Sequence, residues 1–345
     1  MDIIYSKLSG KNDPMFGKFE HPIKALIEEE SSNWSKRKTA LTYLWNIESS
    51  HRYSETIMGQ SSFSTFASKK EGQGAENDNI EKTFDKTIEH ISFAKEFTIT
   101  REMADDSKIG ISSNMTKVAK QFTRAYYRTQ IDIACKALIN GTKTSFKYSN
   151  DTVDLTTGDK EPLFSKAHKY ALDSVKGTQS NYFYAPASKI TDGVEDLLNV
   201  ISNKVRNFKD ENGEIMGYVA NVVIVPCNRP ELEAKVKKAC GSERTVGSNN
   251  NDVNTQYGNW TVVVLDGWET TADELMVMSS EANEELSGNM FFNRVSLDIR
   301  NEIDNHTRNF IWNGYCRFGL GFGTWKHIAR CKIADSASDA TALYA

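Results

Sequence analysis

The segment that decides the fold is Asn114 to Ile139, NMTKVAKQFTRAYYRTQIDIACKALI. Its apolar side chains recur at the spacing of one helical face; they are Met115, Val118, Ala119, Phe122, Ala125, Tyr126, Ile133, Ala137 and Leu138. Ser113 or Asn114 can cap the start, and Asn140 with Gly141 is expected to end the helix in a left-handed turn. About 26 residues at about 1.5 Å each give a rod of roughly 39 Å, longer than a typical globular helix.

Residues 55–93, upstream of this helix, predict a long β-hairpin around a polar, glycine-containing tip at 71–79. On its second strand Phe84, Ile88 and His90 alternate with polar residues, so one side of the strand is apolar. A hairpin with so few large apolar side chains cannot bury a core of its own. We therefore expect it to pack on something outside the chain.

The first 48 residues predict an arm rather than a domain. Glycine and proline follow each other closely at Gly10, Pro14 and Gly17, and one short helix is predicted from Pro22 to Glu30. No basic segment followed by an apolar stretch opens the chain, so we expect no signal peptide and a cytosolic protein.

Residues 191–272 predict a small α/β unit, because helices alternate with apolar strands. A helix over 192–208 is followed by a turn at Asn212-Gly213, a buried strand over 219–225, a helix from Pro230 and a second strand over 260–265. From Leu275 onward the sequence is mostly strand-like, in the segments LMVMSS, VSLDIRNEID, RNFIWNGYCRFGLGF and TWKHIARCKI. The last ten residues are small and polar and predict a loose tail.

The composition is that of a soluble globular protein. The chain has 345 residues, 39% hydrophobic and 26% charged, with a net charge of −4, and no apolar run approaches the length of a membrane-spanning helix. Its mild negative charge argues against a dedicated nucleic-acid-binding protein. The five cysteines are odd in number and never spaced as CxxC, which favours reduced thiols over disulfides or a zinc site.

The sequence predicts no catalytic residue, no cofactor and no metal site. Ser165, His168 and Asp173 have the residue types of a hydrolytic triad, but no GxSxG accompanies them, so a structural role is preferred. The six histidines form no HxxxH or HxH pair. Asp105-Asp106 is interpreted as favourable charge near a helix start rather than a cation site.

Three further patterns have a structural and a functional interpretation. The glycines of Gly319–Gly323 are expected at a bulge or tight turn between strands rather than in a phosphate loop. An aromatic set is expected in the core rather than on a surface that stacks single strands; it comprises Phe291, Phe292, Phe310, Trp312, Tyr315, Phe318 and Trp325. A basic series along the long helix fits a solvated face as well as it fits a functional one, which would face DNA or form intersubunit ion pairs; its members are Lys117, Lys120, Arg124, Arg128 and Lys136.

Taken in order, several segments resemble the major capsid proteins of tailed phages with the Hong Kong 97 fold, in particular the Mu-like major head subunits. The resemblance covers residues 50–333. Its motifs are FAKEFTITREMADD at 93–106, ALING at 137–141, EPLFSKAH at 161–168, VVIVP at 222–226, NWTVVV at 259–264, RFG at 317–319 and WKHI at 325–328.

The resemblance implies an α+β fold with named parts. These are an N-terminal arm (1–48), an extended loop formed by the β-hairpin (49–95), a peripheral domain (96–190) with the spine helix at 114–139, an α/β axial domain (191–272), and return strands of the peripheral domain with a C-terminal tail (273–345). The family crosslinks subunits through Lys and Asn in its prototype, but no motif matches around Lys69 or Lys70, so we expect no crosslink here.

The resemblance also implies the function and the partners. The chain would be the major capsid protein of a tailed double-stranded DNA phage or prophage, forming pentamers and hexamers of an icosahedral shell in the host cytoplasm and ending in the virion. Expected partners are a separate scaffolding protein, because only about 50 residues precede the hairpin, a portal, a decoration protein and non-specifically held DNA, but no membrane. The alternatives are a cargo-enclosing nanocompartment of the same fold, or a soluble α/β enzyme built on residues 191–272.

Overall fold

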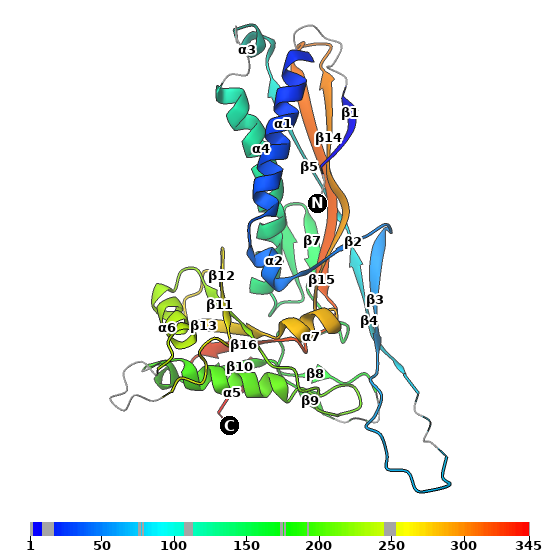
Figure 1. The fold of residues 1–345 in the computed structure, drawn as a ribbon, viewed down its shortest axis with the longest axis vertical. Coiled ribbons are helices and arrows are strands. Elements are labelled where there is room, and N and C mark those ends of the chain that lie inside the picture. The colour runs from blue at the N-terminus through cyan, green and yellow to red at the C-terminus, as the bar shows by residue number, and fades with distance from the viewer. Residues whose placement is uncertain are drawn as a thin grey trace.

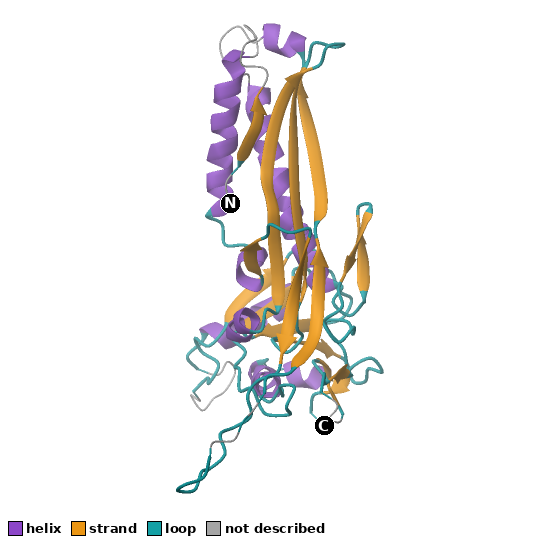
Figure 2. Ribbon diagram, turned by 90° about the vertical axis from the view of Figure 1, so that its right-hand side faces the viewer, coloured by secondary structure: helices purple, strands orange, loops and turns teal. Residues whose placement is uncertain are grey.

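The computed structural model describes residues 3–8, 17–74, 77, 79–106, 113–172, 175, 177–191, 193–244 and 253–344. The molecule is elongated, with two long helices beside a long sheet at one end and a second sheet with shorter helices at the other (Figure 1). One hairpin lies against the side of the long sheet, and its loop points away from the body (Figures 1 and 2). The buried apolar residues of both sheets form one continuous core.

The long sheet has the strand order β1-β14-β15-β5, with β2 pairing to another part of β14. Its centre is an antiparallel pair of unusually long strands, in which Phe291, Trp312 and Phe318 are buried. The N-terminal strands β1 and β2 both run parallel to β14. The strands are β1 (Ile4–Leu8), β2 (Asn46–Ser49), β5 (Ile91–Ile99), β14 (Asn289–Ile303) and β15 (Phe310–Phe322).

The predicted long helix is confirmed as α4 (Ser113–Ile139), which has 27 residues. Helix α1 (Gly17–Ser35) lies along it and buries Ile23 and Ile27 completely. The short helices of this half are α2 (Ala40–Leu44) and α3 (Arg101–Asp106). The predicted helix from Pro22 to Glu30 is therefore too short, since α1 extends beyond it at both ends, and Ser31 and Trp34 continue the contact with α4 through Tyr127.

The second sheet has six strands in the order β12-β11-β13-β16-β10-β17. Every residue of its strands β11 and β13 is buried. Helices α5 (Glu195–Arg206) and α6 (Pro230–Gly241) pack against it. The strands are β10 (Tyr182–Ala185), β11 (Val222–Pro226), β12 (Thr261–Leu265), β13 (Glu274–Met278), β16 (Ile328–Ile333) and β17 (Thr341–Ala342).

Three two-stranded hairpins and two short helical segments complete the described chain. The predicted hairpin of residues 55–93 is confirmed in part: only its base is paired, and the second predicted strand continues into β5 of the long sheet. The elements are β3 (Ser54–Gln60) with β4 (Lys82–Glu89), β6 (Ser145–Tyr148) with β7 (Asp151–Asp154), β8 (His168–Lys169) with β9 (Thr178–Gln179), η2 (Ala187–Ile190) and α7 (Ser280–Glu285).

After residue 272, the strands that the resemblance assigns to the peripheral domain divide between the two sheets: β14 and β15 lie in the long sheet, and β13, β16 and β17 pair in the six-stranded sheet. One expectation for this part of the chain is wrong, because the described residues of the last ten do not form a loose tail. Leu343 is only 1% exposed and β17 pairs with β10, so the buried leucine holds this segment on the sheet.

Gly141 also differs from the prediction, since its φ is not among the positive values found at other glycines. A Cβ at Gly141 would lie 2.9 Å from the Phe164 ring. The glycine therefore allows close packing against Phe164 and does not provide a left-handed helix end. Gly213, in contrast, has a φ of +85° and confirms the predicted turn at Asn212-Gly213.

Candidate assembly interface

The residues that resembled a hydrolytic triad do not form one. His168 is fully buried, its Nδ1 lies 2.8 Å from Asp159 Oδ2 and its Nε2 lies 3.2 Å from Asn181 Oδ1. The ring stacks on Trp325 with 4.3 Å between centroids. Ser165 Oγ accepts a hydrogen bond from the Ala167 amide instead of contacting the imidazole; Asp173 lies outside the described residues.

The Asp159–His168 contact has an electrostatic consequence. Burial alone would raise the pKa of Asp159, but hydrogen bonds from His168, Thr157 and the Glu161 amide together lower it below its ordinary value. Asp159 therefore stays ionised as a hydrogen-bond acceptor for the loop that leads to β8. The arrangement fixes a buried histidine between two loops, which is a structural role.

The acidic pair Asp105-Asp106 and the five cysteines do not come together into a metal-binding group among the described residues. Asp105 and Asp106 close α3 rather than start a helix, and Asp105 Oδ2 lies 3.8 Å from Arg101 Nε. Across the described chain, no group of three metal-ligating side chains comes together. The cysteines are all free thiols, and Cys227 is the exposed one. No helix among the described residues has the length and apolar character to cross a bilayer.

The glycines of Gly319–Gly323 lie within and just after β15, where the pairing with β14 is regular, so the predicted bulge or tight turn between strands is wrong. A Cβ at Gly319 would lie 2.6 Å from the Glu89 carbonyl oxygen, and one at Gly321 would lie 2.9 Å from Ile88. These glycines let the end of β4 cross directly over β15. They position the β3–β4 hairpin on the long sheet.

The aromatic set is confirmed as core, apart from Tyr315, which is 37% exposed. Most of the basic side chains along α4 form ion pairs within the chain. Arg124 Nε donates to Glu30 Oε1 at 2.6 Å, Lys120 Nζ lies 3.4 Å from Glu29 Oε2, and the Arg124 hydrogen bond lowers the pKa of Glu30. These ion pairs hold α1 on α4, an intrasubunit role that the sequence analysis did not consider.

The β3–β4 hairpin and its loop carry the largest gathering of exposed apolar side chains along one described segment. Phe66 is fully exposed, Met58 is 67% exposed and Phe63 is 62% exposed; Ile80 and Phe84 are also exposed. Isolated exposed apolar residues are ordinary, but several on one projecting segment indicate an interaction surface. The described residues of the loop between β3 and β4 form no strand or helix that could cover them.

The base of this hairpin is fixed to the body. Ile57 and Ile88 pack with Met290 and Phe292 in a small apolar cluster separate from the main core. Lys86 Nζ donates to Asp154 Oδ2 at 2.6 Å and to Thr156 Oγ1 at 2.9 Å, although the lysine side chain is only 6% exposed. These contacts fix the base of the β3–β4 hairpin, so the exposed apolar loop projects from the body in a defined direction.

The loop is tied to the body near its start. Asn212 Nδ2 donates to the Ser62 carbonyl at 2.6 Å, and the Thr65 amide donates to Glu214 Oε1 at 3.2 Å. The sequence predicts the hairpin but not these anchors, since residues about 150 positions apart give no local signal.

The exposed apolar side chains of the β3–β4 hairpin and its loop are typical of an assembly subunit, a protein whose apolar surface becomes buried by contact with other chains. Comparison with known proteins agrees: the family described as phage capsid protein matches residues 85–331, more than half of the chain. The chain belongs to this phage capsid protein family and is a structural protein.

Solved structures support the same fold. The chain is similar to one in the capsid structure of the cyanophage P-SCSP1u, with 10% identity, a TM-score of 0.51, and 87% of this chain and 89% of that one covered. Identical values describe its similarity to the mature capsid of bacteriophage PhiM1. A chain of Mycobacterium phage Patience has 13% identity, a TM-score of 0.50, and coverage of 98% and 94%. No curated protein is significantly similar in sequence.

Proposed function

We propose that the chain is the major capsid subunit of a tailed double-stranded DNA phage or prophage, of the Hong Kong 97 and Mu-like type. Many copies would form the pentamers and hexamers of an icosahedral shell, assembled in the host cytoplasm and retained in the virion. The observation that supports this most is the β3–β4 hairpin, which is anchored at its base and exposes Met58, Phe63 and Phe66. Such a loop gains apolar burial only when a neighbouring subunit covers it.

The proposed parts are those of a tiling subunit. Residues 1–48 would be the arm, 49–95 the extended loop, 96–190 with 273–345 the peripheral domain, and 191–272 the axial domain. In this structure α1 of the arm lies on α4. The six-stranded sheet takes strands from 182–185, 222–278 and 328–342, so the axial domain would include more of the chain than 191–272.

The proposed partners follow from the same function. A separate scaffolding protein would guide closure, a portal would occupy one vertex, a decoration protein would bind outside, and DNA would be held inside without sequence recognition. Weak contacts repeated over many copies suffice for such a shell, since binding at one interface raises the effective concentration at the next.

Electron microscopy with light scattering tests the proposal. The chain would be expressed alone and with a scaffolding protein from the same genome. Closed shells, tubes or ring-shaped capsomers are expected, and a uniform monomer or dimer under both conditions would contradict the proposal.

Deleting residues 69–79 tests the extended-loop assignment separately. The deletion leaves β3, β4 and the small apolar cluster in place, so the subunit should fold with an unchanged circular dichroism spectrum but form no closed shells. Shells of normal size from this variant would show that the loop has another role.

A further inference from the structure

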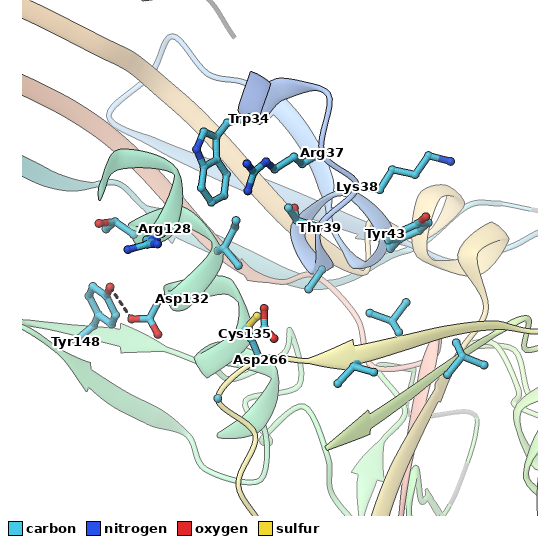
Figure 3. Close-up of a pocket in the computed structure, with 17 residues that line it drawn as sticks. Trp34, Arg37, Lys38, Thr39, Tyr43, Arg128, Asp132, Cys135, Tyr148 and Asp266 are labelled. Atoms are coloured by element: carbon cyan, nitrogen blue, oxygen red, sulfur yellow. Dashed lines mark hydrogen bonds between the residues drawn. The ribbon is translucent and has the colours of Figure 1, made fainter. Parts of the chain in front are cut away.

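A pocket of about 980 Å³ lies between the end of α1, helix α2, one side of α4 and strand β12 (Figure 3). Trp34, Tyr43 and Tyr148 contribute aromatic walls, and Cys135 lies on its α4 side. The pocket is open to the surface beside the edge of the six-stranded sheet. We call it the β12 groove.

Three cations border this groove: Arg37, Lys38 and Arg128. The Arg37 guanidinium lies 4.3 Å from the Trp34 ring centroid, and Lys38 Nζ lies 6.0 Å from that of Tyr43. None of the three forms an ion pair with a carboxylate of the described chain. They contrast with Lys120 and Arg124, which are neutralised by α1. Arg128 lies one helical turn farther along α4, near the level where α1 ends.

Two carboxylates also line the groove and reduce its positive charge. Asp132 Oδ2 accepts hydrogen bonds from Lys136 Nζ at 2.8 Å and from the Tyr148 hydroxyl at 2.9 Å, so its charge is balanced locally. Asp266 is the one remaining anion. Three cations against one unbalanced carboxylate leave the groove positive.

Strand β12 adds backbone groups to this surface. It is the edge strand of its sheet, and the Thr261 amide donates to the Asn221 carbonyl at 2.8 Å. Because hydrogen bonding alternates along a parallel strand, the N–H and C=O groups of Val262 and Val264 are directed away from β11, and both residues line the groove. An edge of this kind accepts an extended segment of another chain.

The hairpin loop has the complementary properties. Residues 71–81 carry four acidic side chains and no basic one, and they are flanked by Lys69, Lys70 and Lys82, the last of which pairs with Asp85. The loop projects away from the body on the side opposite β12 in Figure 1, so a chain does not reach its own groove. The loop is opposite in charge to the groove, and the edge of β12 has unpaired backbone groups that an extended segment can bind. Because the loop of the same chain lies on the other side of the molecule, the expected occupant is the loop of a second copy.

We propose that the β12 groove receives the acidic loop, residues 71–81, of a neighbouring copy, with Arg37, Lys38 and Arg128 binding its carboxylates. The inference rests on the proposed function and adds the receiving surface. It differs from a general overlap of neighbours, because it assigns named charges to each side.

Peptide binding tests the groove independently of shell formation. A capped peptide of residues 71–81 would be titrated with unassembled subunit and followed by fluorescence anisotropy. Binding should weaken about tenfold in R128E and in K38E, and also as salt rises, since exposed charges are screened. K117E makes the same charge change on an exposed part of α4 outside the groove, so it should bind like the wild type. Equal binding by all variants would overturn the proposal.

A charge swap then tests the second copy as occupant. R128E and the loop variant E71K/E81K should each lower shell yield about tenfold, and the combination should recover most of it. Unfolding midpoints equal to the wild type would show that the variants fold. Wild-type shells with no loss in R128E would refute the groove while the proposed function stands. Loss in R128E only when the scaffolding protein is present, without rescue by the loop variant, would assign the groove to that protein instead and overturn the proposal.

Discussion

The six-stranded sheet and the β3–β4 hairpin with its loop differ in how much of their apolar surface is buried within the subunit. In the sheet, every residue of β11 and β13 is buried, and the strands come from distant parts of the chain. In the hairpin, strands that are neighbours in sequence expose Met58 and present Phe66 in the loop between them. The sheet therefore stabilises the single subunit, whereas the exposed apolar side chains of the hairpin and its loop contribute only when other chains cover them.

Truncating the core of the body should give the largest effect on the free subunit. Phe318 is 1% exposed and stacks on Phe93 at 4.7 Å and on Phe291 at 5.2 Å. Phe318→Ala should lower the free energy of unfolding by about 3–5 kcal/mol, through lost burial and a residual cavity. Urea unfolding of the unassembled subunit measures this. A loss below about 1 kcal/mol would mean that the core is not the source of subunit stability.

Removing the Lys86 charge should have an intermediate and local effect. Lys86→Met keeps the apolar stem but breaks the hydrogen bonds to Asp154 and Thr156, so the hairpin should open more often at a cost of about 1–2 kcal/mol. Limited proteolysis should cut residues 61–81 faster, while the urea midpoint of the body hardly moves. Lys82→Met, whose partner Asp85 lies on the same strand, is the matched control.

The same contact gives a pH dependence with a defined sign. Although burial opposes ionisation, the Lys86 hydrogen bond and those from Thr156 lower the pKa of Asp154 below its ordinary value of 3.8. A carboxyl group whose pKa is lowered on folding stabilises the folded state at pH values above its ordinary pKa. This stabilisation is lost as the pH falls through the pKa of the folded state. Acid below pH 3.8 should therefore increase cleavage of the wild-type loop, with a smaller change in Lys86→Met.

Changing the exposed loop should have the smallest effect on the free subunit and a large one on assembly. Phe66→Ser removes a fully exposed ring, so the free energy of unfolding should change by less than about 0.5 kcal/mol. Shell yield, measured by sedimentation, should fall severalfold. Tyr315→Ser, which changes an exposed aromatic on the long sheet, separates this effect from a general loss of surface aromatics. Normal shell yield from Phe66→Ser would remove the contrast between hairpin and body.

Local periodicity was sufficient to predict the elements but not their neighbours. The long helix follows from its apolar spacing, and the late strands follow from β-rich runs. The sheet that each late strand joins was not predicted, because pairing between distant strands leaves no local pattern. Gly141 was also misread, since the reason for its glycine is Phe164, a contact that exists only in the folded chain.

The hairpin and the groove differ in how far sequence predicts them. The hairpin was predicted because alternating strands without enough apolar residues for a core are visible along the chain. The groove was not, since Arg37 and Arg128 are 91 positions apart and only the packing of α1 on α4 brings them together. The sequence identifies Arg128 as one of the basic residues on the long helix. Only the folded structure shows that Lys120 and Arg124 form ion pairs with α1, whereas Arg128 forms none within the described chain.

The position of β16 in its sheet has a consequence for the timing of synthesis. This strand lies between β13 and β10, yet of the strands in the sheet only β17 follows it in the chain. A ribosome that has made the hairpin, the long helix and β10 to β13 still holds a sheet divided into two parts. Because long-range pairing must wait for the last partner, the subunit completes its fold late. Nascent chains on one messenger can therefore expose their hairpin loops before the six-stranded sheet is complete.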